Sequence, residues 1–194
     1  GSLFSPPKGG WGVFLLLLLS CTGHPDEVRL EGEFANIEQG EFLIYSTDEA
    51  LDRIDTLHIQ DGAFSYPLPT SVPAPLRIRY PNQSELVVFA NPGADILIKG
   101  DAQNLSEVEV SGSEDNECYT NFRLETNGKS AAETKATAHE YILGNPTLTM
   151  SRYLFTNYFL CDPASHSIIW QYLSNTSLYS SGSFEVIDSN LGDT

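Results

Sequence analysis

Apolar and polar residues alternate along much of the chain between residues 28 and 111, and this period of two predicts β-strands. In the first of these strands Val28, Leu30 and Phe34 are separated mainly by charged residues, which is typical of a strand with one buried face. Leu86 to Ala90 is apolar without interruption, which predicts a central strand that is covered on both faces. The expected strands cover residues 28–34, 41–46, 56–60, 63–68, 76–80, 86–90, 95–99 and 107–110.

Turn signals separate these strands. Asp61-Gly62 predicts a tight hairpin, because a type I′ turn needs a positive φ at both central residues. Prolines 67, 69, 73 and 75 predict interruptions in strand pairing, since proline has no N–H to donate. About eight short strands separated by turns predict an antiparallel sandwich or barrel.

From residue 113 the apolar spacing changes to that of helices. Ser113 is a candidate N-cap followed by acidic residues, and Gly128 can end the first helix. Further helices are expected over residues 131–143, over 148–160 after Asn145-Pro146, and after Asp162-Pro163. The fold class expected from the whole pattern is α+β, an antiparallel β-sandwich over residues 28–125 followed by a small helical region over 126–180 and a loose tail over 181–194.

The N-terminal segment, residues 1–20, has the pattern of a signal peptide. Lys8 is its only charged residue, and its apolar core from Val13 to Leu19 is seven residues long. A membrane-spanning helix needs roughly 20 apolar residues, whereas a signal-peptide core needs about 7–15. A buried helix is the alternative for this segment, although five consecutive leucines offer it no polar face.

The residues that end this segment, Leu18-Leu19-Ser20-Cys21, resemble a bacterial lipobox. The resemblance implies cleavage before Cys21, attachment of diacylglycerol to the Cys21 sulfur, and a tether over residues 21–27. It places the protein in the cell envelope, anchored by lipid at the outer membrane or the periplasmic face. Asp26-Glu27 resemble a surface-export signal of Bacteroidetes lipoproteins, and a solvated linker is the alternative.

The charge and the hydrophobic content of the chain exclude some classes of protein. Aspartate and glutamate number 26 against 10 lysines and arginines, so the formal net charge is −16. A chain this acidic is not expected to bind nucleic acid by neutralising phosphates. Hydrophobic residues make up 41% of the chain, which is enough for a folded core and excludes disorder along its whole length.

Candidate catalytic and metal-ligating residues do not form a known arrangement. The cysteines are Cys21, Cys118 and Cys161, and no Cys-x-x-Cys is present. Cys118 and Cys161 either form a disulfide or remain as two buried free thiols. The four histidines are scattered without zinc-ligand spacing, and no Gly-x-Ser-x-Gly elbow occurs. We therefore predict no catalytic residue, no metal and no cofactor.

Two arginines on one predicted strand, Arg77 and Arg79, share a face. They form either an anion site or a cross-strand charge ladder with outward carboxylates such as Glu107 and Glu109.

The order of several short motifs resembles the DUF4369 family of Bacteroidetes lipoproteins over about residues 27–125. These motifs are Leu30-Glu31-Gly32-Glu33-Phe34, Asp55-Thr56-Leu57, Asp61-Gly62-Ala63-Phe64, residues 86–93, Val110-Ser111-Gly112-Ser113 and residues 141–146. The resemblance implies a β-sandwich of unassigned function, which in this family commonly precedes a thioredoxin-like domain with a redox Cys-x-x-Cys. That motif is missing from these residues, so the redox activity of longer relatives is not carried over to any position. Asp55-Thr56-Leu57 also resembles a Bacteroidetes O-glycosylation site, which would modify Thr56.

Two functional hypotheses follow from the sequence. The first is a lipid-anchored envelope protein whose non-catalytic sandwich binds a partner or ligand of unknown identity. The alternative is an accessory or truncated N-terminal part of a thioredoxin-like thiol–disulfide oxidoreductase, with a separate thioredoxin-like envelope protein as partner.

Overall fold

The computed structural model describes residues 25–46, 51, 53–160 and 162. Its strands are β1 (Glu27–Ala35), β2 (Gln39–Tyr45), β3 (Ile54–Gln60), β4 (Ala63–Pro69), β5 (Ala74–Arg79), β6 (Glu85–Ala90), β7 (Asp95–Asp101) and β8 (Asn104–Ser111). Its helices are α1 (Glu114–Thr126), α2 (Ala131–Gly144) and α3 (Thr149–Tyr158). All eight predicted strands and the first three predicted helices are confirmed, with ends that differ by a few residues. The signal peptide over 1–20, Cys21, the helix expected after Asp162-Pro163 and the tail over 181–194 lie outside the described residues.

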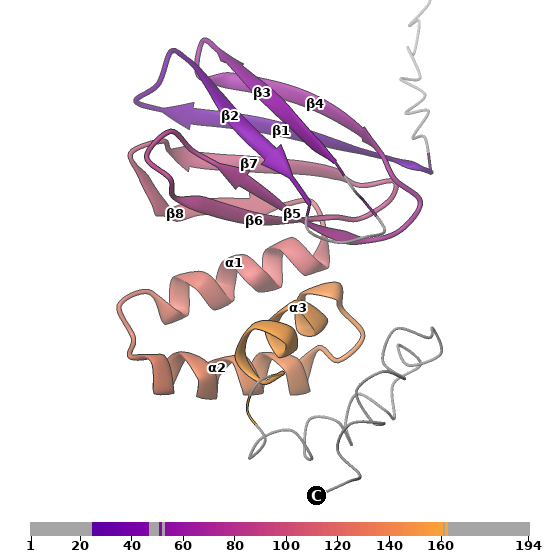
Figure 1. Cartoon of the computed structure of the whole chain (residues 1–194), viewed down its shortest axis with the longest axis vertical. Coiled ribbons are helices and arrows are strands. Elements are labelled where there is room, and N and C mark those ends of the chain that lie inside the picture. Colours follow the sequence, from indigo (N-terminus) through magenta and orange to yellow (C-terminus); the bar gives the residue numbers. More distant parts are fainter. Residues whose placement is uncertain (1–24, 47–50, 52, 161, 163–194) are drawn as a thin grey trace, which may run out of the picture.

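The strands form one sheet in the order β6-β5-β2-β3-β4-β1-β7-β8. The sheet curls so that its two end strands, β6 and β8, approach each other, and the helices lie along that side (Figure 1). The α+β class is therefore confirmed, and the division of the sheet into a sandwich stays a prediction. The antiparallel prediction is wrong for one pair, because β1 and β7 run parallel. Five strands separate these two along the chain, so no hairpin sets their relative direction.

The sheet is least tightly paired between β3 and β4. These strands pair only at Gln60 and Ala63, beside the Asp61-Gly62 turn. The φ angles of 52° and 75° in this turn confirm the predicted hairpin turn. Pro67 and Pro69 align with β1 on one side of β4 but have no N–H to donate to β3 on the other. The predicted interruption by these prolines is therefore confirmed on the β3 side of β4 and absent on the β1 side.

Strand β6 is buried on both faces but lies at one end of the sheet. Leu86 and Val88 contact the core enclosed by the sheet, whereas Val87 and Phe89 belong to a second apolar cluster formed with the helices. The predicted central position is wrong because helices, and not a further strand, cover the remaining side of β6. A continuous apolar run reports burial of both faces and does not report which elements cover them.

Helix α1 bridges the gap between β6 and β8 with side-chain hydrogen bonds to the main chain of both strands. The Asn116 amide accepts from the N–H of Phe89 at 2.8 Å and donates to its carbonyl oxygen at 2.8 Å. The Thr120 hydroxyl accepts from the N–H of Val110 at 3.1 Å and donates to its carbonyl oxygen at 3.0 Å. The Arg123 guanidinium donates to three β8 carbonyls, those of Leu105, Ser106 and Val108. The helix thus satisfies main-chain groups that a neighbouring strand would otherwise pair.

Main-chain N–H groups at the starts of α1 and α3 donate to side-chain oxygens, which come from the N-cap residue in α1 and from another helix in α3. Ser113 caps α1 as predicted, because its hydroxyl oxygen accepts a main-chain N–H of the first turn. Leu148 is the N-cap residue of α3, and its apolar side chain cannot accept a hydrogen bond from the first turn. The buried carboxylate of Asp115, from the first turn of α1, accepts the N–H of Met150 at 2.7 Å instead. The same carboxylate accepts from the Asn91 amide at 2.7 Å, so it joins the end of β6 to α1 and α3.

Candidate functional site

Of the two predicted modification sites, Thr56 and Cys21, the structure describes only Thr56. Thr56 lies in β3 opposite Leu43 of β2, with its side chain partly exposed, and its N–H donates to the Asp55 carboxylate at 2.8 Å. Cys21 lies outside the described residues. No helix in the described part of the chain combines the length and the hydropathy needed to cross a bilayer.

The solvent-facing side of β2, β3 and β5, here called the outer face, carries the most varied exposed chemistry of the sheet. Strand register places Glu41 opposite His58, and Tyr45 opposite both Ile54 and Arg77. The outer face comprises Glu41, Leu43, Tyr45, Ile54, Thr56, His58, Arg77 and Arg79.

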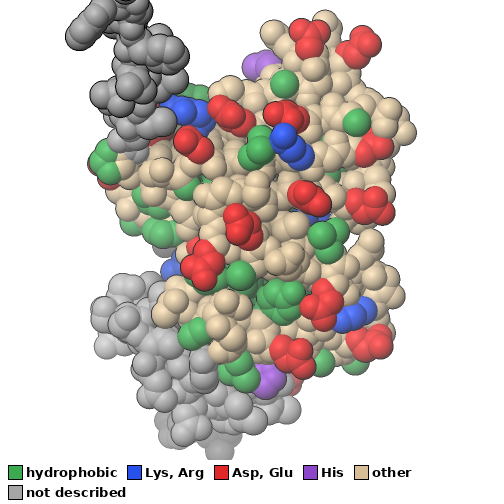
Figure 2. Space-filling model, turned by 180° about the vertical axis from the view of Figure 1, so that it is seen from behind, with side chains coloured by type: hydrophobic (Ala, Val, Ile, Leu, Met, Phe, Trp, Pro, Cys, Tyr) green, Lys and Arg blue, Asp and Glu red, His purple; other side chains and the backbone are tan. Residues whose placement is uncertain are grey.

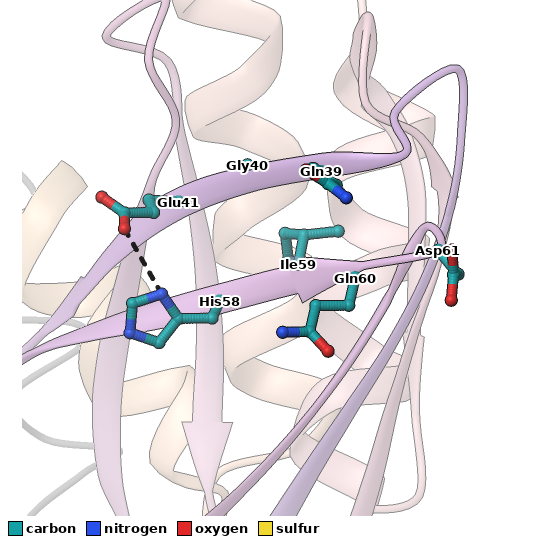
Figure 3. Close-up of a pocket in the computed structure, with 7 residues that line it drawn as sticks. All are labelled: Gln39, Gly40, Glu41, His58, Ile59, Gln60 and Asp61. Carbon is teal, nitrogen blue, oxygen red and sulfur yellow. Dashed lines mark ion pairs between the residues drawn. The ribbon is translucent and has the colours of Figure 1, made fainter.

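One end of the outer face is hollowed beside the Asp61-Gly62 turn. The hollow has a volume of about 550 Å³ and is open to solvent. In Figure 3 the side chains of Glu41 and His58 point toward each other, and the His58 Nδ1 lies 3.4 Å from the Glu41 Oε1. The lining residues are Gln39, Gly40, Glu41, His58, Ile59, Gln60 and Asp61. These amide, carboxylate and imidazole groups provide hydrogen bonds to a polar ligand, but the hollow lacks the enclosure and apolar lining of most small-molecule sites.

A charged cluster lies on the β5 side of the outer face and centres on Glu85, at the start of the adjacent strand β6. One Glu85 oxygen accepts from the Tyr45 hydroxyl at 2.6 Å and from Arg79 Nε at 2.8 Å, and the other accepts from Arg77 Nη1 at 3.1 Å. The Tyr45 hydrogen bond, with help from the two guanidinium groups, holds the pKa of Glu85 below its ordinary value.

The arginines therefore form a cross-strand charge cluster, and the partners predicted for it are wrong. Glu107 and Glu109 lie on β8, at the opposite end of the strand order from β5. Glu109 instead aligns with Lys99 of β7, whose amine lies 2.8 Å from a Glu33 carboxylate oxygen on β1. The carboxylate that neutralises Arg77 and Arg79 comes from the adjacent β6, whose register the sequence pattern did not reveal.

We expect the Glu85 cluster to stabilise the fold in a pH-dependent way. Because the folded-state pKa of Glu85 is lowered, its ionised form stabilises the folded state above the ordinary value of 4.5, and this contribution is lost as the pH falls through the lowered pKa. A Glu85→Gln variant should lose about 1 kcal/mol of unfolding free energy at pH 7, since the cluster is partly solvent-exposed. Denaturant unfolding should show this loss at pH 7 and a smaller loss at pH 3.

The matched control is Glu107→Gln, which removes an exposed carboxylate outside the cluster. It should leave the unfolding free energy nearly unchanged at both pH values. A Glu85→Gln loss as large at pH 3 as at pH 7 would show that the carboxylate charge has no part in the effect.

The surroundings of Cys118 disfavour its thiolate form. Burial, followed by the nearby carboxylates Glu114, Asp115 and Glu117, raises the pKa of the Cys118 thiol. Its S–H faces the side-chain oxygen of Asn145 at 3.8 Å. Activated thiols have a lowered pKa, so Cys118 is not poised as a nucleophile. Cys161, with which Cys118 either forms a disulfide or remains as a second free thiol, lies outside the described residues.

Acidic side chains are scattered over both the sheet and the helices on the face shown in Figure 2. The described ranges hold no group of three or more His, Cys, Asp or Glu able to bind a metal ion. The residues that sequence reasoning missed are Tyr45, Glu85 and the hollow around Gln39 and Gln60. The predicted strand 41–46 contains Tyr45, and the predicted strand 86–90 begins one residue after Glu85, but only the β2–β5–β6 register brings the two residues together.

Comparison with known proteins gives one match. Residues 28–119 match the family model described as a domain of unknown function, DUF4369. No curated protein matches the chain, and no solved structure matches it. The matched residues begin in β1, contain all of β2 to β8 and end within α1, so they include the whole outer face.

Proposed function

We propose that this chain is a lipid-anchored protein of the cell envelope whose sheet domain binds a partner or ligand and catalyses no reaction. The observation that carries the proposal is the apolar run Val13 to Leu19 followed directly by Ser20-Cys21. The run is too short to span a bilayer, which needs about 20 residues, and a small residue before the cysteine is what lipoprotein processing requires.

The outer face is the proposed binding surface. It combines hydrogen-bonding groups in the hollow, a tyrosine and two arginines fixed by Glu85, and the exposed side chain of Leu43. Such a mixture of aromatic, arginine and apolar groups is common at protein interaction surfaces.

A second part of the proposal concerns how the eight strands are arranged. We infer that β6-β5-β2-β3 and β4-β1-β7-β8 are the two halves of a sandwich, which is supported by the single paired position between β3 and β4.

Metabolic labelling with radioactive palmitate tests the anchor. The chain, expressed with an initiator methionine in a bacterium that processes lipoproteins, should incorporate label. The Cys21→Ala variant should incorporate none and should keep residues 1–20. Cys118→Ala is the matched control and should be labelled like the parent chain, because it leaves Cys21 in place. Label retained by Cys21→Ala would overturn the proposal.

The alternative function is an accessory or N-terminal part of a thiol–disulfide oxidoreductase, favoured by the resemblance to domains that precede thioredoxin-like domains. The raised pKa of Cys118 supports the view that this chain has no redox activity of its own. We therefore expect an insulin-reduction assay with dithiothreitol to show no turnover above background. Turnover that disappears in Cys118→Ser would show that the chain itself is a redox enzyme and would refute the non-catalytic proposal.

A further inference from the structure

The two ends of the sheet differ in chemistry, and only one of them receives the N-terminal segment. We call the end where β1 begins the tether end. There, the Asp26 carbonyl oxygen accepts the N–H of Thr70 at 2.9 Å, and the Glu27 carbonyl oxygen accepts the N–H of Gly93 at 2.9 Å. These bonds fix the entering chain between the loops 70–73 and 91–94 (Figure 1).

Exposed aliphatic side chains mark the tether end. The described residues include four exposed large hydrophobic side chains, those of Leu43, Ile54, Val72 and Leu124. Ile54, at the start of β3, is 74% exposed, and Val72, in the loop 70–73, is 40% exposed. The Thr70 hydroxyl bonds to both the N–H and the carbonyl oxygen of Val72, so this loop presents Val72 in a fixed position.

The opposite end of the sheet, called the far end, consists of polar turns. Its turns contain Asn36, Asp61 and Gln83 with positive φ, and Asp101, which accepts from the Asn36 amide at 2.7 Å. None of the four exposed large hydrophobic side chains lies in these turns. Strand β4, which joins the two ends, has seven residues and therefore spans about 20 Å.

The short link from Cys21 limits how the domain sits on a membrane. From Cys21 to Pro25 the chain advances four residues, which reach at most about 14 Å when fully extended. We propose that the tether end, with Ile54 and Val72, faces and contacts the lipid surface, and that the far end points away from it. This inference rests on the proposed lipid anchor at Cys21.

The charges of the tether end determine what kind of contact it makes with the lipid surface. Four carboxylates at this end would repel anionic headgroups, those of Asp26, Glu27, Asp55 and Asp95. Arg29 lies 3.4 Å from Asp95 and Arg53 lies 3.7 Å from Asp55, so the two arginines neutralise only part of that charge. The contact is therefore apolar and held by the tether, without attraction to anionic lipid. It also turns the hollow, which lies beside the far-end turn at Asp61, toward solvent and accessible partners.

Site-specific fluorescence quenching tests the orientation. The lipidated full chain, with Cys118→Ser and Cys161→Ser, receives Val72→Cys in one version and Asp61→Cys in the other. Each is labelled with a thiol-reactive bimane, which the Cys21 thioether cannot take up. The chains are reconstituted in phosphatidylcholine vesicles with and without a nitroxide on the lipid headgroup. The nitroxide should remove most of the fluorescence at position 72 and little at position 61.

The outcomes separate the two proposals. A chain that fails to float with vesicles would refute the lipid anchor and, with it, the orientation. A chain that floats but is quenched equally at both positions, or more strongly at 61, would refute the orientation alone. Circular dichroism of both labelled chains should match that of the parent, because Val72 and Asp61 are exposed.

Discussion

Replacing Asn116 by alanine should lower the free energy of unfolding by about 2–5 kcal/mol, because two buried main-chain groups lose their hydrogen-bond partner at once. Asn116 is 1% exposed, and its amide pairs with both the N–H and the carbonyl oxygen of Phe89 on β6. No strand lies on that side of β6 to replace it, and α1 covers the gap. Denaturant unfolding measures the loss, and hydrogen exchange should show faster exchange of the Phe89 amide.

Two variants make this prediction specific. Asn121 lies on the exposed side of α1, so Asn121→Ala should leave stability unchanged or raise it slightly, since alanine favours helix. Asn116→Asp keeps the size of the side chain and the acceptor for the Phe89 N–H. It places a carboxylate against the Phe89 carbonyl oxygen, so it should destabilise most at neutral pH and recover partly when protonated. Equal stability of Asn116→Ala and Asn121→Ala would show that α1 does not close the sheet.

The residues that close the sheet also show where sequence reasoning stops. Asn116, Thr120 and Arg123 are spaced so that they share one side of a helix, and a polar side of a helix normally predicts solvent. Here that side meets unpaired main chain at β6 and β8. Strand and helix positions were predictable from local periodicity, whereas this contact depends on which strands end the sheet, and periodicity carries no information on strand order.

The candidate site was also predictable only in part, because its contacts depend on strand order and register. The position of Arg77 and Arg79 on one face followed from their spacing, and the pattern correctly paired them with carboxylates as a class. The choice of Glu85 required the register of β5 with β6. Burial of Cys118 was one of the two alternatives predicted for it, and the thiol is partly buried against the helix cluster, where burial is the largest cause of its raised pKa.

We expect that loss of the proposed lipid at Cys21 moves the chain completely from the membrane to the aqueous phase. Each buried CH₂ contributes roughly 0.8 kcal/mol, and a stable anchor takes two or more acyl chains, so the lipidated chain should stay with membranes or the detergent phase. A chain that lacks residues 1–20 and carries Cys21→Ala should move entirely to the aqueous phase. Residues 1–20 are removed in this variant because an uncleaved apolar run could itself retain the precursor at the membrane.

Phase separation in Triton X-114 measures this partition for the lipidated chain and the truncated variant in parallel. The same variant provides the control for folding, because its circular dichroism should keep the mixed strand and helix signal of β1 to β8 and α1 to α3. Ile54 and Val72 are too few to hold the domain on a bilayer alone, since fully burying one such side chain gains only about 1.5–3 kcal/mol. A truncated variant that still enters the detergent phase would show that the domain surface, and not the lipid on Cys21, binds the membrane.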